Sequence, residues 1–385
     1  MREWISEELE RLRKAGLYRS LRNVDSAQAP VIILSGEEVI NFCSNDYLAL
    51  AADPRMGAAV RAASFKWRSG SGSSRLISGN MSVFAGLEDE LARFMNAAAA
   101  LYFTSGYHAN TGIIPVLAEK EDAVFSDRLN HASIIDGCRL SRARLAVYDH
   151  ADPPSLEEAL AKTEARRKLV VTESLFSMDG DLAPLPEIIE AARKHDAMVL
   201  LDEAHAFGLL GKNGRGALQH FGMDTDAVDV VVGTLGKAGG SAGAFACGSP
   251  EMIELLKNRV RPFIFTTGPL PAAAVAAREG LRVMEDEPWR KDRALWLAEE
   301  LRAALAETGY DIASGPGAIV PLIVGPEETA MELCRLLLMK GIFVQGIRPP
   351  TVPAGASRLR ISLTAGHTDA HLEKLIHALK EVLEI

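Results

Sequence analysis

The sequence has little cysteine, no long apolar run and no excess of positive charge, and each scarcity excludes a class of protein. Its four cysteines, Cys43, Cys138, Cys247 and Cys334, are scattered without a CxxC pair, which argues against a disulfide framework or a zinc site. No apolar run approaches the roughly 18–20 residues that a membrane span needs. The formal net charge of −9 argues against nucleic acid as a partner, because phosphate binding requires a basic surface.

What remains is typical of a globular protein, with 48% apolar and 24% charged residues. The first residues, MREWISEELERLRKAG, mix both charge signs and lack an apolar core, so we expect no signal peptide and a cytoplasmic location. The 385 residues are more than one core comfortably holds, which predicts more than one domain.

The middle of the chain alternates short apolar strands with helix-like stretches. Six strand candidates lie in AALYFTSGYHANTG, DAVFSD, RLAVYDH, KLVVTESLF, AMVLLDEAH and DVVVGTLGK. This pattern predicts an α/β fold with a mainly parallel, doubly wound sheet covered on both faces. We expect this large domain over residues 55–275, after an N-terminal helix and small hairpin in residues 1–54. A smaller C-terminal α/β domain, with its linking helix, is expected over residues 276–385, where GIFVQGI and SRLRISLTA are strand-like.

Polar side chains gather where the strands end, which is where ligands bind in doubly wound sheets. Asp202 ends the strand in AMVLLDEAH, His205 follows within one turn, and Lys237 follows the next strand. A lysine with a lowered pKa forms Schiff bases with carbonyls, and an ionised aspartate can pair with a protonated ring nitrogen. Together they predict pyridoxal phosphate, held at its aldehyde by the lysine and kept protonated at its ring by Asp202.

The same cofactor needs an anion site and a group against its ring. TSGYHANTG places Ser105 and Gly106 at a strand-to-helix junction, where free backbone N–H groups and the helix dipole attract a phosphate. Thr234 can add a hydroxyl, Glu173 ends another strand, and His131 can stack on the ring. Each of these residues alone could be an ordinary strand end or helix start. Their joint occurrence favours the cofactor site.

Eight stretches of the chain match a known family. They are NFCSNDYLAL, GSGSSRLISGN, YFTSGYHANTG, RLNHASIIDG, VTESLFSMDGDLAPL, LLDEAHAFGLLGKNGRG, GTLGKAGGSAGA and IRPPTVPAGASRLRISLTAGH. On these motifs the chain resembles the α-oxoamine synthases, which are pyridoxal-phosphate enzymes of fold type I. Members of this family condense an amino acid with an acyl thioester and lose carbon dioxide. The resemblance implies a homodimer with shared active sites.

The resemblance also implies a role for each matching residue. Lys237 would hold the cofactor and act as the base, and His131 would stack on the ring and assist at the thioester carbonyl. The other cofactor residues would be Ser105, Gly106, Tyr107, Glu173, Ser177, Asp202, His205 and Thr234, joined by Thr266 and Thr267 of the neighbouring subunit. The substrate residues would be Arg360, which clamps the amino-acid carboxylate, with Asn45, Arg19, Thr351 and Arg348; Arg19 and Thr351 match acyl-donor positions.

Within the family, the RPPTVPAG loop favours the branch that serves biotin synthesis. Its substrates are L-alanine and a pimeloyl thioester, carried by coenzyme A or by an acyl carrier protein, and its reaction releases carbon dioxide and the free thiol. Glycine-using relatives, such as 2-amino-3-ketobutyrate ligase and 5-aminolevulinate synthase, and serine palmitoyltransferase stay open as alternatives. One methyl group gives only about 1–3 kcal/mol of discrimination, so the sequence does not settle the amino acid.

Three further points bear on these interpretations. A non-catalytic partner subunit could dispense with the cofactor lysine, but here Lys237 is present. Arg19 lies among several basic residues, so a solvated helix face is the competing interpretation for it. Arg75 stands where some members carry histidine, and Gly268 where serine is common. Both departures concern the wall of the site and leave the cofactor prediction unchanged.

Overall fold

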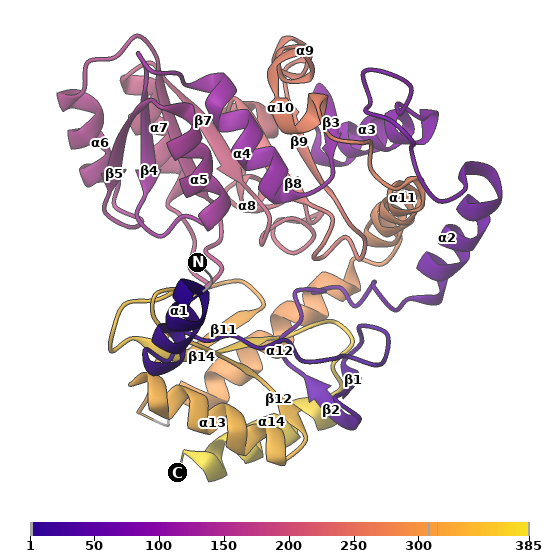
Figure 1. Cartoon of the computed structure of the whole chain (residues 1–385), viewed down its shortest axis with the longest axis vertical. Coiled ribbons are helices and arrows are strands. Elements are labelled where there is room, and N and C mark those ends of the chain that lie inside the picture. Colours follow the sequence, from indigo (N-terminus) through magenta and orange to yellow (C-terminus); the bar gives the residue numbers. More distant parts are fainter. Residues whose placement is uncertain (1–2, 307–308, 314, 384–385) are drawn as a thin grey trace.

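The computed structural model describes residues 3–306, 309–313 and 315–383. It forms two lobes, of which the larger is built on a seven-stranded sheet and the smaller on two short sheets (Figure 1). Within the described ranges, no helix is both long enough and apolar enough to cross a membrane.

The large sheet has the predicted doubly wound form. Its strands run in the order β3 (Ala99–Phe103), β9 (Ala244–Gly248), β8 (Val230–Thr234), β7 (Ala197–Asp202), β6 (Lys168–Glu173), β4 (Ala123–Asp127) and β5 (Arg144–Tyr148). The neighbours from β8 to β5 pair in parallel. Strand β9 is antiparallel to both of its neighbours and was absent from the six predicted strands, because its AFACG run is short and lies between glycines.

Alternation along the strands fills a core on each face of this sheet. In β6, Leu169 and Val171 join one apolar cluster and Val170 joins the other, as the two-residue period of a strand requires. The first cluster is covered by α4 (Gly106–Leu117), α5 (Ala132–Ser141), α9 (Pro250–Arg259) and α10 (Arg261–Ile264); the second is covered by α3 (Ser82–Met95), α6 (Pro153–Lys162), α7 (Leu185–Lys194) and α11 (Pro271–Asp286). With both faces buried, ligands can reach the sheet only at its strand ends.

The smaller lobe contains an antiparallel sheet in the order β10 (Asp311–Ile312), β11 (Ile319–Gly325), β14 (Ser357–Ser362) and β13 (Gln345–Ile347). Helices α12 (Trp289–Ala306), α13 (Glu327–Met339) and α14 (Asp369–Val382) pack against this lobe. The predicted N-terminal hairpin is confirmed as β1 (Val31–Leu34) and β2 (Glu37–Asn41). Strand β12 (Ile342–Phe343) pairs in parallel with β2, so GIFVQGI divides into two strands that belong to different sheets.

The chain changes lobe beside helix α11. The boundary expected near residue 275 falls inside α11, which packs on α2 (Pro54–Trp67) and α3. Helix α12 contributes Ala294 to the core of the large lobe and Leu297 and Leu301 to the core of the small lobe. Helix α12 therefore packs on both lobes. The remaining helical elements are α1 (Glu3–Lys14), α8 (Ala217–His220) and the 3-10 turn Thr225–Ala227.

Candidate active site

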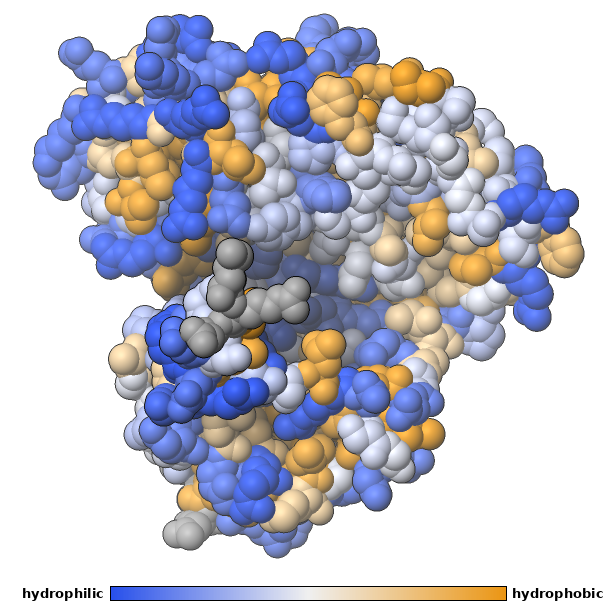
Figure 2. Space-filling view, viewed as in Figure 1, coloured by the Kyte–Doolittle hydropathy of each residue, from blue (hydrophilic) through white to orange (hydrophobic). Residues whose placement is uncertain are grey.

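The polar residues singled out in the sequence meet where the large sheet faces the small lobe. The surface is hollowed between the two lobes (Figure 2). Strands β6 and β7 end there at Glu173 and Asp202, and β8 leads there to Lys237. Strand β14 brings Arg360 to the same place from the small lobe, because its side chain contacts the carbonyl of Ser177 beyond β6.

A chain of hydrogen bonds leads from Arg360 to Lys237. Arg360 Nη2 donates to Asn45 Oδ1 at 3.1 Å, and the Tyr47 hydroxyl donates to the same oxygen at 3.2 Å. The Tyr47 oxygen lies 2.7 Å from His205 Nδ1, and His205 Nε2 lies 2.7 Å from Lys237 Nζ. Since the Tyr47 proton is directed to Asn45, the contact requires Nδ1 of His205 to carry the ring proton and Nε2 to accept from Lys237.

The charges and burial around this series of hydrogen bonds favour a reactive amine at Lys237. Burial lowers the pKa of Lys237 to about 8, although the carboxylates of Asp202 and Glu173 oppose the shift. Burial, and then the nearby charge of Lys237, hold the pKa of His205 well below its usual value. The ring of His205 is therefore neutral at pH 7, as the hydrogen-bond chain requires. A lysine with such a pKa is partly unprotonated near neutral pH and can attack a carbonyl.

Asp202 is fixed by a residue that the sequence did not single out. Its Oδ2 accepts from Asn110 Nδ2 at 2.7 Å, and its Oδ1 accepts from the backbone of Ala204 at 2.9 Å. Asn110 also donates to Ser133 Oγ at 3.0 Å. Asn110 lies in the buried part of α4, so the only available signal was one amide within an apolar helix.

His131 lies at the N-terminus of α5 and is held by Glu173. Its backbone N–H donates to Glu173 Oε1 at 2.6 Å, and its Nδ1 lies 2.8 Å from Ser133 Oγ. Burial lowers the pKa of His131, with Asp202 opposing the shift. Burial, and then repulsion from Asp202, raise the pKa of Glu173 to about 8. The Glu173 carboxyl thus positions His131 through the backbone.

The anion site predicted at α4 involves the start of this helix and Thr234. Ser105 caps this helix by accepting from His108 N at 3.2 Å, and the first N–H groups of a helix, at Gly106 and Tyr107, have no partner within it. A Cβ atom on Gly106 would lie 4.0 Å from the Cβ of Thr234. The hydroxyl of Thr234 donates to the carbonyl of Gly243 at 3.1 Å, so it lies at the same edge.

This donor set fits pyridoxal phosphate. Lys237 supplies an amine with a lowered pKa for the aldehyde. Asp202 supplies a carboxylate with a fixed orientation for the ring nitrogen, and His131 supplies an imidazole nearby. The start of α4 supplies backbone N–H groups for a phosphate, beside the hydroxyl of Thr234.

Three of the predicted substrate residues line one cavity. Arg19, Arg348 and Thr351 surround a space of about 400 Å³ that Gln345 also lines. Gln345 is the cross-strand partner of Arg360 in the β13–β14 pair, so the cavity lies one strand away from the guanidinium. Helix α1 ends at Lys14, so Arg19 lies beyond the helix, but its side chain is exposed as the competing interpretation expected.

The two threonines assigned to the neighbouring subunit lie elsewhere in this chain. Thr266 and Thr267 line a small cavity with Arg75 and Thr104. Arg75 is buried there, where it donates to both carboxylate oxygens of Glu88, to Asn80 and to the carbonyl of Tyr102. A Cβ atom on Gly268 would lie 3.0 Å from the carbonyl oxygen of Gly79. Both departures from the family pattern therefore belong to the packing of this wall.

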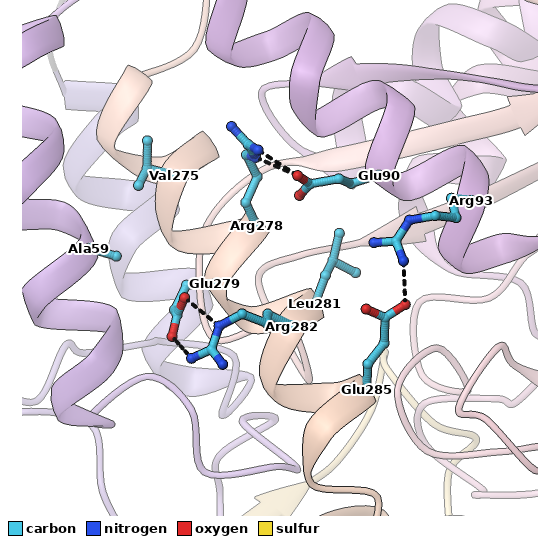
Figure 3. Close-up of a pocket in the computed structure, with 9 residues that line it drawn as sticks. All are labelled: Ala59, Glu90, Arg93, Val275, Arg278, Glu279, Leu281, Arg282 and Glu285. Atoms are coloured by element: carbon cyan, nitrogen blue, oxygen red, sulfur yellow. Dashed lines mark hydrogen bonds and ion pairs between the residues drawn. The ribbon is translucent and has the colours of Figure 1, made fainter.

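A separate surface pocket of about 380 Å³ lies between α3 and α11. Its charged residues pair with one another: Arg278 with Glu90, Arg282 with Glu279, and Arg93 with Glu285 (Figure 3). None of the predicted site residues lines it. Since each arginine already has a carboxylate partner, the pocket is not a competitor for the site at Lys237.

Comparison with known proteins identifies relatives over nearly the whole chain. Residues 37–379 match the family of class I and II aminotransferases. The chain is 48% identical over 381 residues to an 8-amino-7-oxononanoate synthase of Anaeromyxobacter dehalogenans, covering 99% of this chain and 96% of that protein. It is 47% identical over 382 residues to the synthase of Symbiobacterium thermophilum, covering 99% and 97%. The solved serine palmitoyltransferase of S. paucimobilis, with a bound PLP–myriocin aldimine, matches at 31% identity and a TM-score of 0.93, covering 99% of this chain and 97% of that chain.

Proposed function

The chain belongs to the class I and II aminotransferase family, and from this premise we propose that it condenses L-alanine with a pimeloyl thioester. The products are 8-amino-7-oxononanoate, carbon dioxide and the free thiol, and the reaction serves biotin biosynthesis. The cofactor is pyridoxal phosphate. The observation that carries the substrate assignment is 47–48% identity, over 99% of the chain, to enzymes that bear the name of this activity. The serine palmitoyltransferase shares the fold at only 31% identity.

Lys237 is the proposed base. When bound, pyridoxal phosphate supplies an electron sink for the negative charge that develops at the α-carbon. The amine of Lys237, with its pKa lowered to about 8, takes the α-proton of alanine and later returns one. His205 Nε2, at 2.7 Å, accepts a hydrogen bond from that amine and so keeps it directed into the site. His131 is the proposed donor to the thioester carbonyl oxygen as charge develops there.

Arg360 is the proposed clamp for the alanine carboxylate. Its Nε donates to the carbonyl of Ser177 at 2.6 Å and its Nη1 to Ser362 Oγ at 2.9 Å, so the plane of the guanidinium is fixed. Its Nη2 contacts Asn45, which shares the proposed task. A fixed guanidinium fork matches a carboxylate in geometry and charge.

The cavity lined by Arg19, Arg348 and Thr351 is the proposed entrance for the acyl donor. Its position one strand from Arg360 would bring the thioester toward the bound amino acid. Two arginines suit an anionic donor, and the donor is anionic whether coenzyme A or an acyl carrier protein carries the pimeloyl group.

We also propose a cytoplasmic homodimer in which each subunit completes the other's phosphate site through Thr266 and Thr267. In their own chain these threonines line a different cavity from the Lys237 cluster. The neighbouring Phe265 is 69% exposed, and Ile77 is 80% exposed. Exposed large apolar side chains of this kind are common at interfaces.

The test is thiol release from pimeloyl-coenzyme A by the purified protein loaded with pyridoxal phosphate. Alanine, glycine and serine are compared in parallel, with Lys237→Ala as the control. We expect release with alanine, and none from the variant. Release chiefly with glycine or serine would overturn the substrate assignment. Release with none of the three would require the same comparison with a pimeloyl-carrier-protein thioester, and inactivity there would overturn the proposed function.

A further inference from the structure

A short hairpin connects the two lobes beside the site. Residues 175–182, here called the interlobe hairpin, follow β6 and are closed by a bridge between Leu175 and Leu182. On the small-lobe side, the carbonyl of Ser177 accepts from Arg360 Nε at 2.6 Å, and Asp179 pairs with Arg358. The hairpin therefore carries one of the contacts that orient the proposed carboxylate clamp.

On the large-lobe side, His150 fastens the hairpin. His150 follows β5, its Nε2 lies 2.9 Å from Asp181 Oδ2, and its Nδ1 lies 2.9 Å from Asp127 Oδ1. The ring of Phe176, also in the hairpin, meets the imidazole edge-on with 4.4 Å between centroids. Ionised carboxylates only accept hydrogen bonds, so both ring nitrogens must carry protons to satisfy this geometry.

The carboxylates of Asp127 and Asp181 differ in the hydrogen bonds that they make besides those with His150. Asp127 is buried at the end of β4 and also accepts from the backbone of Leu129 at 2.8 Å and of Ala151 at 2.9 Å. Asp181 Oδ1 is buried without a hydrogen-bond partner among the residues that the structure describes. His150 is thus the contact that fixes the Asp181 carboxylate to the large sheet, and it adds to the burial of Leu175 and Phe176 in the core of the large lobe.

The charges around the ring agree with this geometry. Burial alone would lower the pKa of His150, but its hydrogen bonds to Asp127 and Asp181 outweigh burial and raise that pKa to about 10. The neighbouring groups on β5 and beyond it are the buried phenol of Tyr148 and the exposed pair of Arg128 with Asp149. An imidazole with this pKa is an imidazolium at pH 7.

We propose that His150, as a doubly protonated ring, is a positioning residue that holds the interlobe hairpin so that the Ser177 carbonyl orients Arg360. The proposal rests on the proposed function in one respect, the assignment of Arg360 to the amino-acid carboxylate. The path runs from His150 to Asp181, along the hairpin to Ser177, and from its carbonyl to the guanidinium. His150 acts without touching the substrate.

Kinetics of His150→Gln and Asp181→Asn test this path. We expect the KM for alanine to rise about tenfold in each variant, as loss of one charge-assisted hydrogen bond implies, while kcat changes less than about threefold. The double variant should be little worse than either single one, because each removes the charge from the same pair, His150 with Asp181. His377→Gln, at a side chain that is 78% exposed, is the matched control and should leave KM unchanged. An unchanged KM, or additive losses, would overturn the proposal.

A spectroscopic readout separates this proposal from the substrate assignment. With ¹⁵N-labelled histidine, one ring of the nine should keep both nitrogens protonated at pH 8, and its signals should be missing from His150→Gln. A wild-type spectrum in which every ring is neutral at pH 8 would overturn the proposal. If the wild-type enzyme does not use alanine, the proposed function is overturned but the proposal for His150 is not. The KM values of the variants are then measured with the amino acid that the enzyme does use. Should His150→Gln not fold, Asp181→Asn decides, since the carboxamide keeps the size of the side chain.

Discussion

The amine of Lys237 and Nε2 of His205 lie 2.7 Å apart, and this contact is the large-lobe end of a series of polar contacts that reaches the small lobe. His205 contacts Tyr47, Tyr47 contacts Asn45, and Asn45 contacts Arg360 of the small lobe. The Arg360 guanidinium and the Lys237 amine are therefore the two ends of one series of polar contacts. Substitutions along this series of contacts should affect turnover, cofactor attachment or amino-acid binding, and each effect can be measured.

Removing the amine should abolish turnover. Lys237→Ala is expected to lower thiol release by at least about 10³-fold, because both the proposed attachment group and the proposed general base are lost. The far-ultraviolet circular dichroism should match that of the wild type, since Lys237 lies in a turn beyond β8 and not within the sheet. Activity within about tenfold of the wild type would mean that another residue is the base.

Cofactor uptake should depend on pH through Lys237. Only the neutral amine attacks the aldehyde, and a pKa of about 8 leaves about one molecule in ten neutral at pH 7, against about one in three thousand at the ordinary pKa. The rate of cofactor attachment to the stripped protein, followed by visible absorbance, should rise up to about pH 8 and then level off. A rate that keeps rising toward pH 10 would show that the amine has its ordinary pKa.

Replacing the guanidinium by an ammonium should weaken amino-acid binding. Arg360→Lys keeps the charge but loses the fork and the fixed bonds to Ser177 and Ser362. We expect the KM for alanine to rise about 10- to 100-fold, in line with about 1.5–3 kcal/mol for a charged hydrogen bond. Initial rates over a range of alanine concentrations measure this. Arg335→Lys, at an exposed pair with Glu332, is the control, and an equal effect there would contradict the assignment.

The hydroxyl of Tyr47 should matter even though it is remote from the amino acid. Tyr47→Phe leaves His205 Nδ1 without its partner at 2.7 Å, which frees the ring to exchange tautomers. A loss of about five- to tenfold in kcat/KM is expected, equivalent to about 1 kcal/mol for a neutral hydrogen bond. Cofactor attachment monitored over pH should also shift, because the partner of the Lys237 amine has changed. Wild-type kinetics with an unaltered pH profile would show that the hydroxyl has no part in the site.

Buried and exposed ion pairs should differ in stability. Arg75 and Glu88 have side chains that are 6% and 12% exposed, whereas Arg93 and Glu285 are 64% and 39% exposed. Arg75→Ala leaves a buried carboxylate unpaired and should lower the free energy of unfolding by about 3–5 kcal/mol. Arg93→Ala should change it little. Denaturant unfolding of both variants gives the comparison, and equal midpoints would contradict the structural role of Arg75.

Strand and helix periodicity predicted the parallel part of the sheet because both of its faces are buried and its strands are uniformly apolar. The strand-end positions of Asp202 and Lys237 followed from the same pattern. Strand β9 was missed because AFACG carries no signal beyond five small or apolar residues, and only its pairing between β3 and β8 makes it a strand.

Contacts between distant residues explain the other omissions. Tyr47 and Asn110 reach the site through partners that lie 158 and 92 positions away in the chain. His150 fastens a hairpin 31 positions away. The spacing of residues along the sequence does not predict contacts between residues so far apart, so these contacts are known only from the structure.

The pairing of β2 with β12 has a consequence for how the protein is made. Asn41 is aligned with Phe343, so strand β2 cannot pair with β12 until the ribosome has made roughly 300 more residues. At ordinary elongation rates this takes about 15–60 s. By then all seven strands of the large sheet have been made. The small lobe is then the last part to assemble, and the hollow between the lobes comes into being only when synthesis is nearly finished.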